Sequence, residues 1–461
     1  MIRQKNRALD LTQGGIAKQL TLFVLPILAS SLFQQLYTTV DAVIVGQFSG
    51  VLGLAAIDSV YSLLKLPVNF LVGLSSGATI ILSQMVGGNR REELPRVVHT
   101  AIAFSVLGGA LFSVLGVVLA PVCLSWMEVP DNLWGMTLDY LRIYFGGLLF
   151  SMLYNMEAGI LRAMGDSGTP FWILLAAGLS NLALDLLLVG VFSMGVAGAA
   201  LATVFAQLLS AALALRALTR CQGACRVCLR SVRFHSAALV SILRLGLPVG
   251  LQSSLYPIAN TMIQASINRS GTENIAAWAL CGKLDFLIWL CADSLAIAVS
   301  TFVAQNAGAG LLNRVRRGMW TGMGMTLGVV GLLCTILFIW CEQMSKLFIQ
   351  PQDYGIIPLM AQLMRFLAPF YPVYVVGEIL SAVIRGTGET FYPMLLTLAG
   401  TCLTRIGWVL LIVPRQNGIE VIISSYPVSW AVTSVAFLLF YALRRRKILA
   451  VPCLPRQKEP S

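Results

Sequence analysis

Charged residues are scarce in this sequence of 461 residues: Asp, Glu, Lys and Arg make up 11% of it, whereas hydrophobic residues make up 57%. A water-soluble domain carries about a quarter charged residues to cover the surface that faces water. The scarcity therefore excludes a soluble globular protein. Long apolar runs recur along the whole chain instead, and most exceed the roughly 20 residues needed to cross a bilayer.

The motifs of common catalytic and metal sites are also missing. The two histidines, His99 and His235, lie far apart, so there is no HExxH zinc motif, and we find neither a nucleophile elbow nor a Walker loop for ATP. Cys221, Cys225 and Cys228 have a Cys-x3-Cys-x2-Cys spacing that can ligate an iron–sulfur cluster. They lie in a basic linker with no strand–helix repeat around it, so we expect no cluster. We predict no catalytic residue, no metal site, no cofactor and no enzymatic activity.

The apolar runs are predicted to be transmembrane helices, because backbone groups inside the hydrocarbon must pair within each segment. Gly, Leu, Ala and Val do not alternate here with polar residues as they do in the strands of a membrane barrel. The predicted fold class is all-α membrane, with twelve transmembrane helices. The predicted spans are about 16–45, 54–85, 96–120, 136–161, 170–190, 196–218, 239–267, 275–305, 318–340, 356–384, 391–413 and 420–442.

The basic residues are distributed unevenly between the loops. The formal net charge is +12, but nearly all Lys and Arg fall in alternate loops and at the two ends of the chain, and the opposite loops carry only Arg269, Lys346 and Arg415. This asymmetry is the positive-inside signal. It predicts a multi-pass protein of the bacterial cytoplasmic (inner) membrane with both termini in the cytoplasm. It also accounts for the positive charge without nucleic acid, so we expect no nucleic-acid partner.

The two halves of the sequence can be aligned with each other at an offset of about 222 residues, the separation of Pro26 from Pro248. Residues 162–170 match residues 385–393, with Arg, Gly, an acidic residue and Pro in register. The sequence therefore contains an internal repeat of one half. Further matched pairs are Leu25-Pro26 with Leu247-Pro248, Ser83-Gln84 with Ala304-Gln305, and Gly195 with Gly418.

The repeat predicts the domain organisation. Six helices per half is an even number, so both halves enter the membrane from the same side and are related by a pseudo-two-fold axis along the membrane normal, as in known transporters. Two such lobes create a cleft that can open to each side in turn, which is a transport mechanism. We predict an N-terminal six-helix lobe at 1–218, a cytoplasmic linker at 219–238, a C-terminal six-helix lobe at 239–443 and a basic cytoplasmic tail at 444–461.

Several polar side chains stand in the middle of the apolar runs. Ionisable groups at membrane depth are costly and are therefore candidates for function. Residues four or seven positions apart share one face of a helix, and a polar face in an apolar span is expected to line a cavity rather than contact lipid. The N-terminal half has three such stripes: Gln34, Tyr37 and Asp41; Asn181 and Asp185; Thr203 and Gln207.

The order and spacing of these residues resemble the multidrug and toxic compound extrusion (MATE) family over about residues 10–445. The resemblance implies antiport of organic, often cationic, compounds out of the cell against an inward sodium or proton gradient. The features that carry it are Pro26 with Gln34, Tyr37 and Asp41, the Ser-Gln-x-x-Gly-Gly-Asn segment at 83–89, the Arg-Ala-x-Gly-Asp-Ser-x-x-Pro segment at 162–170, and Asn-x-x-x-Asp at 181–185.

The resemblance also implies an ion-coupling site in the N-terminal lobe, made by Asp41, Asn181, Asp185 and Thr203. Two carboxylates in a low-dielectric cleft cannot cheaply both be charged, so a proton or Na⁺ is taken up. Pro26 weakens the helix ladder. We expect a helix bend there that couples ion uptake to the release of substrate.

The C-terminal half does not repeat this acidic site. Gln264 stands in the register of Asp41, and Tyr256 stands where the NorM-like branch of the family carries a glutamate, which favours the DinF-like branch. An aromatic and acidic face on the span 356–384 suits organic cations. The predicted substrate cavity comprises Gln34, Tyr37, Gln207, Tyr256, Gln264, Tyr371, Tyr374 and Glu378.

The leading hypothesis is a monomeric, secondary active exporter of small, amphipathic organic molecules that works by alternating access among membrane lipids. The alternative is a flippase of the same superfamily that carries a lipid or a lipid-linked oligosaccharide. Such flippases generally have a more cationic cavity, whereas the mid-membrane stripes here are acidic. A lipid-modifying enzyme would need reactive groups gathered near one interface, which we do not find, and the two-lobe repeat disfavours a channel. The sequence selects neither the substrate nor Na⁺ over H⁺.

Overall fold

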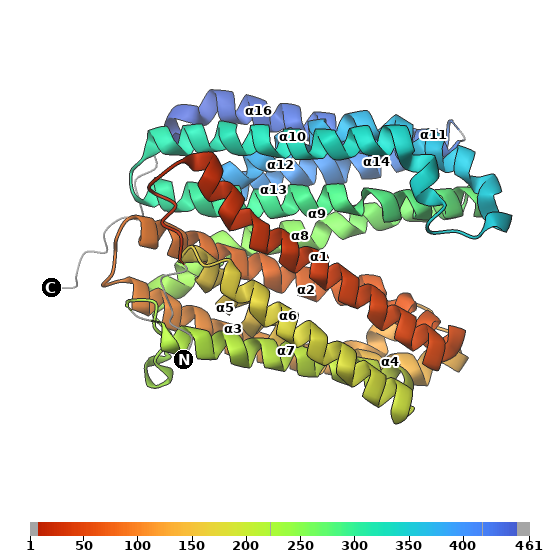
Figure 1. The fold of residues 1–461 in the computed structure, drawn as a ribbon, viewed down its shortest axis with the longest axis horizontal. Helices are drawn as coiled ribbons and strands as arrows, with labels where there is room; N and C mark the ends of the chain where they lie inside the picture. The colour runs from red at the N-terminus through yellow and green to blue at the C-terminus, as the bar shows by residue number, and fades with distance from the viewer. Residues whose placement is uncertain (1–7, 222, 417, 450–461) are drawn as a thin grey trace. The chain divides into compact units, whose positions relative to one another are not determined.

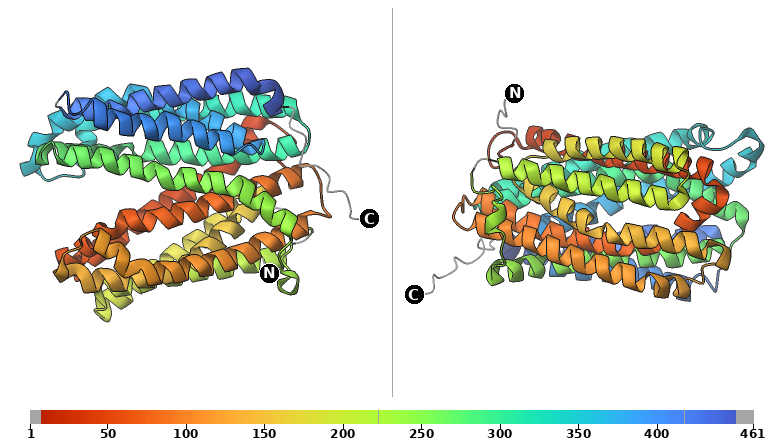
Figure 2. Two further views of the ribbon diagram at one scale, coloured as in Figure 1. Left: turned by 180° about the vertical axis from the view of Figure 1, so that it is seen from behind. Right: turned by 90° about the horizontal axis from the view of Figure 1, so that it is seen from below.

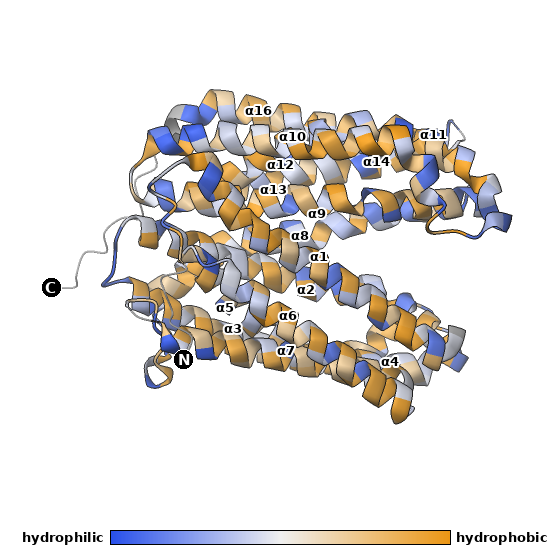
Figure 3. Ribbon diagram, in the orientation of Figure 1, coloured by the Kyte–Doolittle hydropathy of each residue, from blue (hydrophilic) through white to orange (hydrophobic). Residues whose placement is uncertain are grey.

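The computed structural model describes residues 8–221, 223–416 and 418–449, and every regular element in these ranges is a helix. Figure 1 shows the long helices that make up both halves of the chain, and Figure 2 shows them from two further sides. Hydrophobic residues run along the helices, and hydrophilic residues gather at the connecting loops (Figure 3). The first seven residues and most of the predicted basic tail, 450–461, lie outside the described ranges.

The first half of the chain consists of long helices joined by short turns. Gly195, which begins the last of these helices, has φ +59°, a left-handed conformation that glycine adopts without strain. The elements are α1 (Ile16–Phe48), α2 (Gly50–Gly87), α3 (Leu94–Trp126), α4 (Asp131–Gly146), α5 (Leu148–Ala163), α6 (Gly168–Asp185), the π-helical segment η1 (Leu186–Val191) and α7 (Gly195–Arg220).

The second half repeats this order after a linker that contains the short 3₁₀ helix η2 (Leu229–Ser231). Its elements are α8 (Ser236–Asn268), α9 (Thr272–Gly308), α10 (Leu312–Ser345), η3 (Pro351–Ile356), α11 (Ile357–Leu367), η4 (Ala368–Phe370), α12 (Tyr371–Gly386), α13 (Phe391–Thr397), the π-helical segment η5 (Leu398–Leu403), α14 (Thr404–Leu411), α15 (Ile419–Ile423) and α16 (Ser425–Leu449).

The described residues include eleven helices long and apolar enough to cross a membrane. The remaining pass, the fourth along the chain, is formed by α4 and α5 together. Gly147 separates these two helices, which have 16 residues each. The corresponding pass of the second half is also interrupted, by the 3₁₀ turn η4. Gly147 aligns with Pro369 at the offset of the repeat, so the same helix is broken in both halves by different residues. The predicted all-α membrane fold of twelve helices is confirmed.

By their packing, the described residues form two compact units. The first unit comprises the residues up to Leu11 and Leu22–Ser254, and the second comprises Thr12–Thr21 and the residues from Leu255 onward. Helices α1 and α8 therefore each contribute residues to both units. The predicted lobes had instead placed the whole of α1 in one half and the whole of α8 in the other.

The two units have the same internal plan. In the first unit α5 is central and packs against α2, α3 and α7. In the second unit α12 takes this place and packs against α9, α10 and α16. These are the second, third and sixth membrane passes of each half, so the sequence repeat is also a repeat of packing.

Four glycines explain why the start of α8 packs within the first unit. A Cβ added to Gly73 would lie 2.4 Å from the Cα of Gly250, and one added to Gly77 would lie 2.3 Å from the backbone nitrogen of Gly246. Small residues four positions apart let the backbones of membrane helices approach closely. The backbones of α2 and of the first half of α8 are therefore in direct contact.

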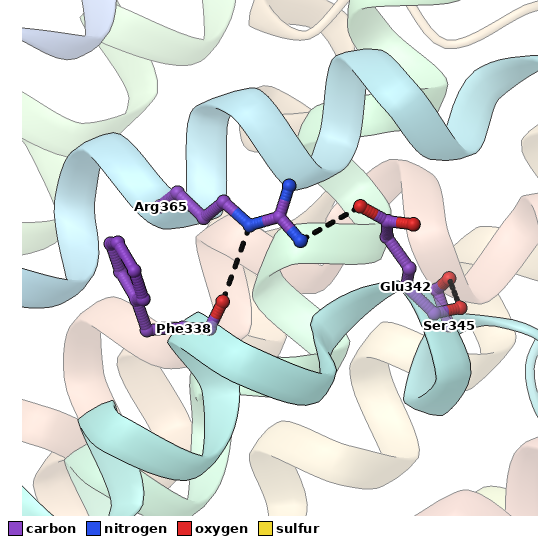
Figure 4. A network of polar contacts seen from close by, with 4 residues as sticks. All are labelled: Phe338, Glu342, Ser345 and Arg365. Carbon is purple, nitrogen blue, oxygen red and sulfur yellow. Dashed lines mark hydrogen bonds and ion pairs between the residues drawn. The ribbon is translucent and has the colours of Figure 1, made fainter.

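A polar contact in the second unit joins the end of α10 to α11 (Figure 4). Arg365 Nη2 lies 2.8 Å from Glu342 Oε1, and Arg365 Nε donates a hydrogen bond of 3.2 Å to the carbonyl oxygen of Phe338. Both charged side chains are 42% exposed. An ion pair with this exposure contributes little to stability.

Candidate functional site

Two aspartates from different helices meet in the first unit. Asp41 lies on α1, and Asp185 is the last α-helical residue of α6, directly before the π-helical turn η1. Their carboxyl groups lie within hydrogen-bonding distance of each other. Asp185 is fully buried, and neither of its side-chain oxygens accepts a hydrogen bond from another described residue. Because two unpaired carboxylates are costly in such an interior, a shared proton or a bound cation would stabilise the pair.

Of the two other predicted ion-coupling residues, Asn181 lies on α6 and Thr203 on α7, and these helices pack against each other. Asn181 lies one turn before Asp185 and is 2% exposed, and among the described residues nothing accepts a hydrogen bond from its Nδ2. Thr203 is half-buried on α7. One turn further on, the amide of Gln207 lies within hydrogen-bonding distance of the Tyr144 hydroxyl. Asn181 thus keeps a buried amide with unused hydrogen-bonding capacity one turn from Asp185, and the role of Thr203 and Gln207 at the pair stays a prediction.

The stripe on α1 rests on α6 through its aromatic residues. The rings of Phe33 and Tyr37 lie 6.2 Å apart, and Tyr37 lies within hydrogen-bonding distance of Gln34. A Cβ on Gly178 of α6 would come within 2.6 Å of the Phe33 ring and 3.0 Å of the Tyr37 ring. Glycine at this position is therefore required for the close approach, while Gln34 stays exposed.

Two tyrosines of α4 belong to the same cluster and were not predicted. Tyr140 interacts electrostatically with both Asp41 and Asp185, and its ring lies 6.1 Å from that of Tyr144. Their spacing of four residues was visible in the sequence. Helix α4 has no acidic residue on that face to distinguish them from the interfacial tyrosines that are common in membrane helices.

In the second unit, the predicted aromatic and acidic face of α12 takes part in separate interactions. The Tyr371 hydroxyl donates a hydrogen bond of 2.5 Å to Asp285 Oδ2 on α9, and Trp289 Nε1 donates one of 3.0 Å to the same oxygen. Glu378 instead accepts a bond of 2.9 Å from Arg385, further along α12. Tyr374 lies between these sites and packs against Trp289, with the ring centroids 4.8 Å apart.

Helix α8 carries the other two predicted cavity residues of the second unit. Gln264 donates a hydrogen bond of 2.9 Å to Asn268 one turn along the same helix. Tyr256 faces Arg405, whose guanidinium carbon lies 5.2 Å from the centre of the tyrosine ring. Arg405 was not predicted as a site residue, although it is the single basic residue inside the predicted span 391–413.

Pro26 lies within α1, which continues through it without interruption. A proline in a helix cannot donate the hydrogen bond to the carbonyl four residues before it. The Ser30 hydroxyl donates a bond of 2.7 Å to the carbonyl of Pro26. The weakened ladder is consistent with the expected bend, which stays a prediction.

The linker cysteines lie near the start of α3, where Cys228 is bonded to His99. The backbone N–H of Cys228 donates a hydrogen bond of 3.0 Å to His99 Nε2. Burial raises the pKa of the Cys225 thiol to about 12. Among the residues that the structure describes, no three His, Cys, Asp or Glu side chains gather as a metal site requires.

The chain is similar over most of its length to curated transport proteins. It is 29% identical over 450 residues to the probable multidrug resistance protein YpnP of Bacillus subtilis (strain 168), covering 96% of this chain and 98% of that protein. It is 27% identical over 394 residues to the probable multidrug resistance protein YoeA of the same strain, covering 84% and 85%. A FAD transporter of Shewanella oneidensis is 23% identical over 318 residues, covering 68% and 70%.

Solved structures share the fold. A transporter of the MOP superfamily from Pyrococcus furiosus, described as having a binding pocket of reverse polarity, gives a TM-score of 0.88 at 19% identity and covers 96% of this chain and 98% of that one. A crystal structure of MATE in the bent conformation gives 0.88 at 18% identity, covering 95% and 97%.

The family model of MatE matches residues 26–187 and again residues 248–409. The two matched segments are equal in length and begin at Pro26 and Pro248, which confirms the internal repeat and its offset. The matched segments cover most of both halves and include Asp41, Asn181, Asp185 and Arg405. This chain therefore belongs to the MatE family of multidrug and toxic compound extrusion proteins, which are multi-pass membrane transporters.

Proposed function

We propose that this protein is a secondary active exporter of amphipathic organic compounds, which moves them by alternating access against an inward gradient of Na⁺ or H⁺. Membership of the MatE family supports export, and the curated relatives named as multidrug resistance proteins support a broad range of organic substrates. The observation that carries the coupling mechanism is the carboxyl pair of Asp41 and Asp185, whose buried oxygens lack hydrogen-bond donors.

The coupling ion acts on this pair. With both carboxyls ionised, repulsion in a poorly solvated interior disfavours their approach. A proton shared between Asp41 and Asp185, or a Na⁺ held by them with the side-chain oxygens of Asn181 and Thr203, removes the repulsion and lets α1 and α6 close on each other. Closure changes the surface offered by Gln34 and Tyr37, so ion uptake displaces the substrate. Bending of α1 at Pro26 transmits the change along the helix.

The proposed substrate contacts are polar and aromatic groups, taken for each unit by itself. In the first unit these are Gln34, Tyr37 and Gln207. In the second they are Tyr256, Gln264, Tyr371, Tyr374 and Glu378, which suit a cationic, aromatic compound through ring faces and negative charge. The substitution of Tyr256 for a glutamate keeps ion coupling in the first unit, as in the DinF-like branch. The protein works as a monomer in the cytoplasmic membrane, with both termini in the cytoplasm and with no cofactor besides the coupling ion.

The test is efflux of a fluorescent organic cation from proteoliposomes with imposed Na⁺ or pH gradients. We expect gradient-driven efflux by the wild type and its loss in Asp41→Asn. Asp139→Asn is the matched control, because Asp139 is an exposed acid on α4. Efflux by Asp41→Asn at the wild-type rate would refute the coupling site. Absence of efflux from folded wild-type protein would favour a lipid-linked substrate and the flippase alternative.

A further inference from the structure

Arg405 is the largest fully buried side chain of the described residues, with an exposure of 0%. It lies on α14, fourteen residues after Phe391, where this membrane pass begins. At 1.5 Å per residue it is about 21 Å along the helix, which places a permanent positive charge inside the membrane span. Charges at such depth are rare and mark functional positions.

The guanidinium group is held in a fixed orientation by neutral partners. Its Nε donates a hydrogen bond of 3.0 Å to the Ser429 hydroxyl of α16, and its Nη1 donates to Asn260 Oδ1 of α8. The ring of Tyr426 lies 4.3 Å from the guanidinium carbon and that of Tyr256 lies 5.2 Å away. Two neighbouring helices, α8 and α16, thus position the group, and neither supplies a negative charge there.

The charge of Arg405 is uncompensated within the described residues. None of their ion pairs includes it, and Nη2 is buried without a hydrogen-bond partner. Three acids inside the spans of the same unit have other partners: Asp285 accepts bonds from Tyr371 and Trp289, Glu378 pairs with Arg385, and Asp293 lies close to the Tyr374 hydroxyl. A buried cation with open donors is unfavourable, so an anion that reaches it binds more tightly because it relieves this cost.

The site corresponds by the repeat to the acidic cluster of the first unit. Asn260 aligns with Tyr37, and Ser429 aligns with Gln207, at an offset of 222 to 223 residues. The aromatic surroundings are also extensive, because Tyr426 contacts the rings of Trp278 and Trp430 at 5.3 Å and 5.9 Å. The same place in the repeated fold therefore holds negative charge in one unit and positive charge beside aromatic rings in the other.

We propose that Arg405 binds an oxyanion, such as a carboxylate, carried by a planar aromatic compound. A guanidinium group has five donors; Ser429 and Asn260 take two, the Tyr256 hydroxyl lies close enough to take a third, and the remaining donors can hold both oxygens of one carboxylate. The aromatic body of the ligand stacks on the tyrosine and tryptophan rings next to it. Arg405 is closed off by Tyr256 and Tyr426, so the ligand reaches it when one of these rings turns aside. This inference rests on the proposed export function and extends its substrates to anionic and zwitterionic amphiphiles.

The test is binding of 9-anthracenecarboxylate to purified protein in detergent, followed by energy transfer from tryptophan, with its uncharged methyl ester as the comparison ligand. We expect the wild type to bind the carboxylate at least about tenfold more tightly than the ester, and Arg405→Gln to abolish this preference, since loss of one partner of a buried charge pair costs at least that much. Arg405→Lys retains part of the preference. Arg444→Gln is the control, because Arg444 also stacks on a tyrosine, Tyr392, but is exposed.

A second variant keeps the test decisive if Arg405→Gln does not fold. Asn260→Asp places a carboxylate of nearly the same shape beside Nη1, so it supplies an internal counter-ion. We expect it to raise the melting temperature and to remove the preference for the carboxylate. A wild type that binds both ligands equally, or an Asn260→Asp variant that still prefers the carboxylate, refutes the inference.

The binding assay needs no gradient, so its result is independent of the efflux experiment that tests the proposed function. If wild-type protein exports an organic cation under a gradient but shows no preference for the carboxylate, the anion site alone is refuted. If it prefers the carboxylate but exports no organic compound under any gradient, the antiport function alone is refuted.

Discussion

In the first half of the chain, α6 ends on a buried aspartate that faces a second aspartate from α1, whereas in the second half α14 carries a buried arginine held by an asparagine from α8. Asp185 and Arg405 both lie on the fifth membrane pass of their half, and both adjoin a π-helical segment, η1 or η5. π-Helical turns are frequent at functional sites. Duplication has thus kept the local architecture and reversed the charge.

Features that recur in both halves of the chain are those that the fold requires. The central position of α5 and α12, with the same three neighbours, and the break in the fourth or tenth pass recur in both halves. The residues that produce the break differ, Gly147 in one half and Pro369 in the other. Backbone packing is therefore preserved, while the polar residues are free to diverge and give the two units different chemical tasks.

The largest expected effect comes from removing the charge of one member of the acidic pair. Asp185→Asn should reduce gradient-driven efflux to the background of protein-free liposomes, because an amide takes up neither a proton nor Na⁺. Asp285→Asn, in the second unit, should keep the gradient dependence, since Asp285 is already satisfied by Tyr371 and Trp289. Equal loss of coupling in both variants would contradict the functional difference between the units.

A large loss of stability is expected where backbones touch. Gly77→Val places a side chain against the backbone of Gly246, which must shift. Overpacking of this kind costs about 1–3 kcal/mol, and the melting temperature in detergent should fall accordingly. Gly324→Val on α10 is the control, because a Cβ there meets nothing within 4 Å. If both variants melted at the same temperature, the close approach of α2 and α8 would not exist in the protein.

A smaller effect is expected for the hydrogen bond between α12 and α9. Tyr371→Phe removes one of the two donors to the half-buried Asp285, and a hydrogen bond to a charged group is worth about 1.5–3 kcal/mol. We expect the free energy of unfolding to fall by an amount near the lower value, because Trp289 still donates its hydrogen bond to Asp285. The measurement is thermal unfolding in detergent beside Tyr354→Phe, which alters a tyrosine of η3 outside the helical core. An unchanged melting temperature in Tyr371→Phe would show that water replaces the hydroxyl.

The smallest effect is expected at the contact between α10 and α11. Glu342→Gln breaks an ion pair whose side chains are both 42% exposed, and pairs of this kind contribute about 0.2–1 kcal/mol. The shift in melting temperature should be small and should disappear at high salt, because solvent ions screen exposed charges. A loss as large as that in Tyr371→Phe would mean that the pair is less accessible to water than its exposure indicates.

The sequence predicted the membrane passes, the repeat and the acidic stripes, because each depends on local periodicity. Apolar runs long enough to cross a bilayer must be helical wherever they pack, and residues four apart share a face in any helix. Asp41 and Asp185 could therefore be chosen as candidates from spacing alone. That α6 brings its aspartate to α1 depends on Gly178, which admits the rings of α1, and only the packed helices show it.

Tertiary structure alone decided the partners of the charged groups in the second unit. The sequence placed Glu378 on one helix face with Tyr371 and Tyr374. In the structure Glu378 pairs with Arg385, and the two tyrosines interact with the aspartates of α9 instead. Arg405 looked like a single basic residue in an apolar span, because its partners lie on α8 and α16, well over 100 residues and 24 residues away along the chain. A sequence determines which faces a helix has, but the energy of a buried charge depends on which other helices surround it, and that is settled only when they pack.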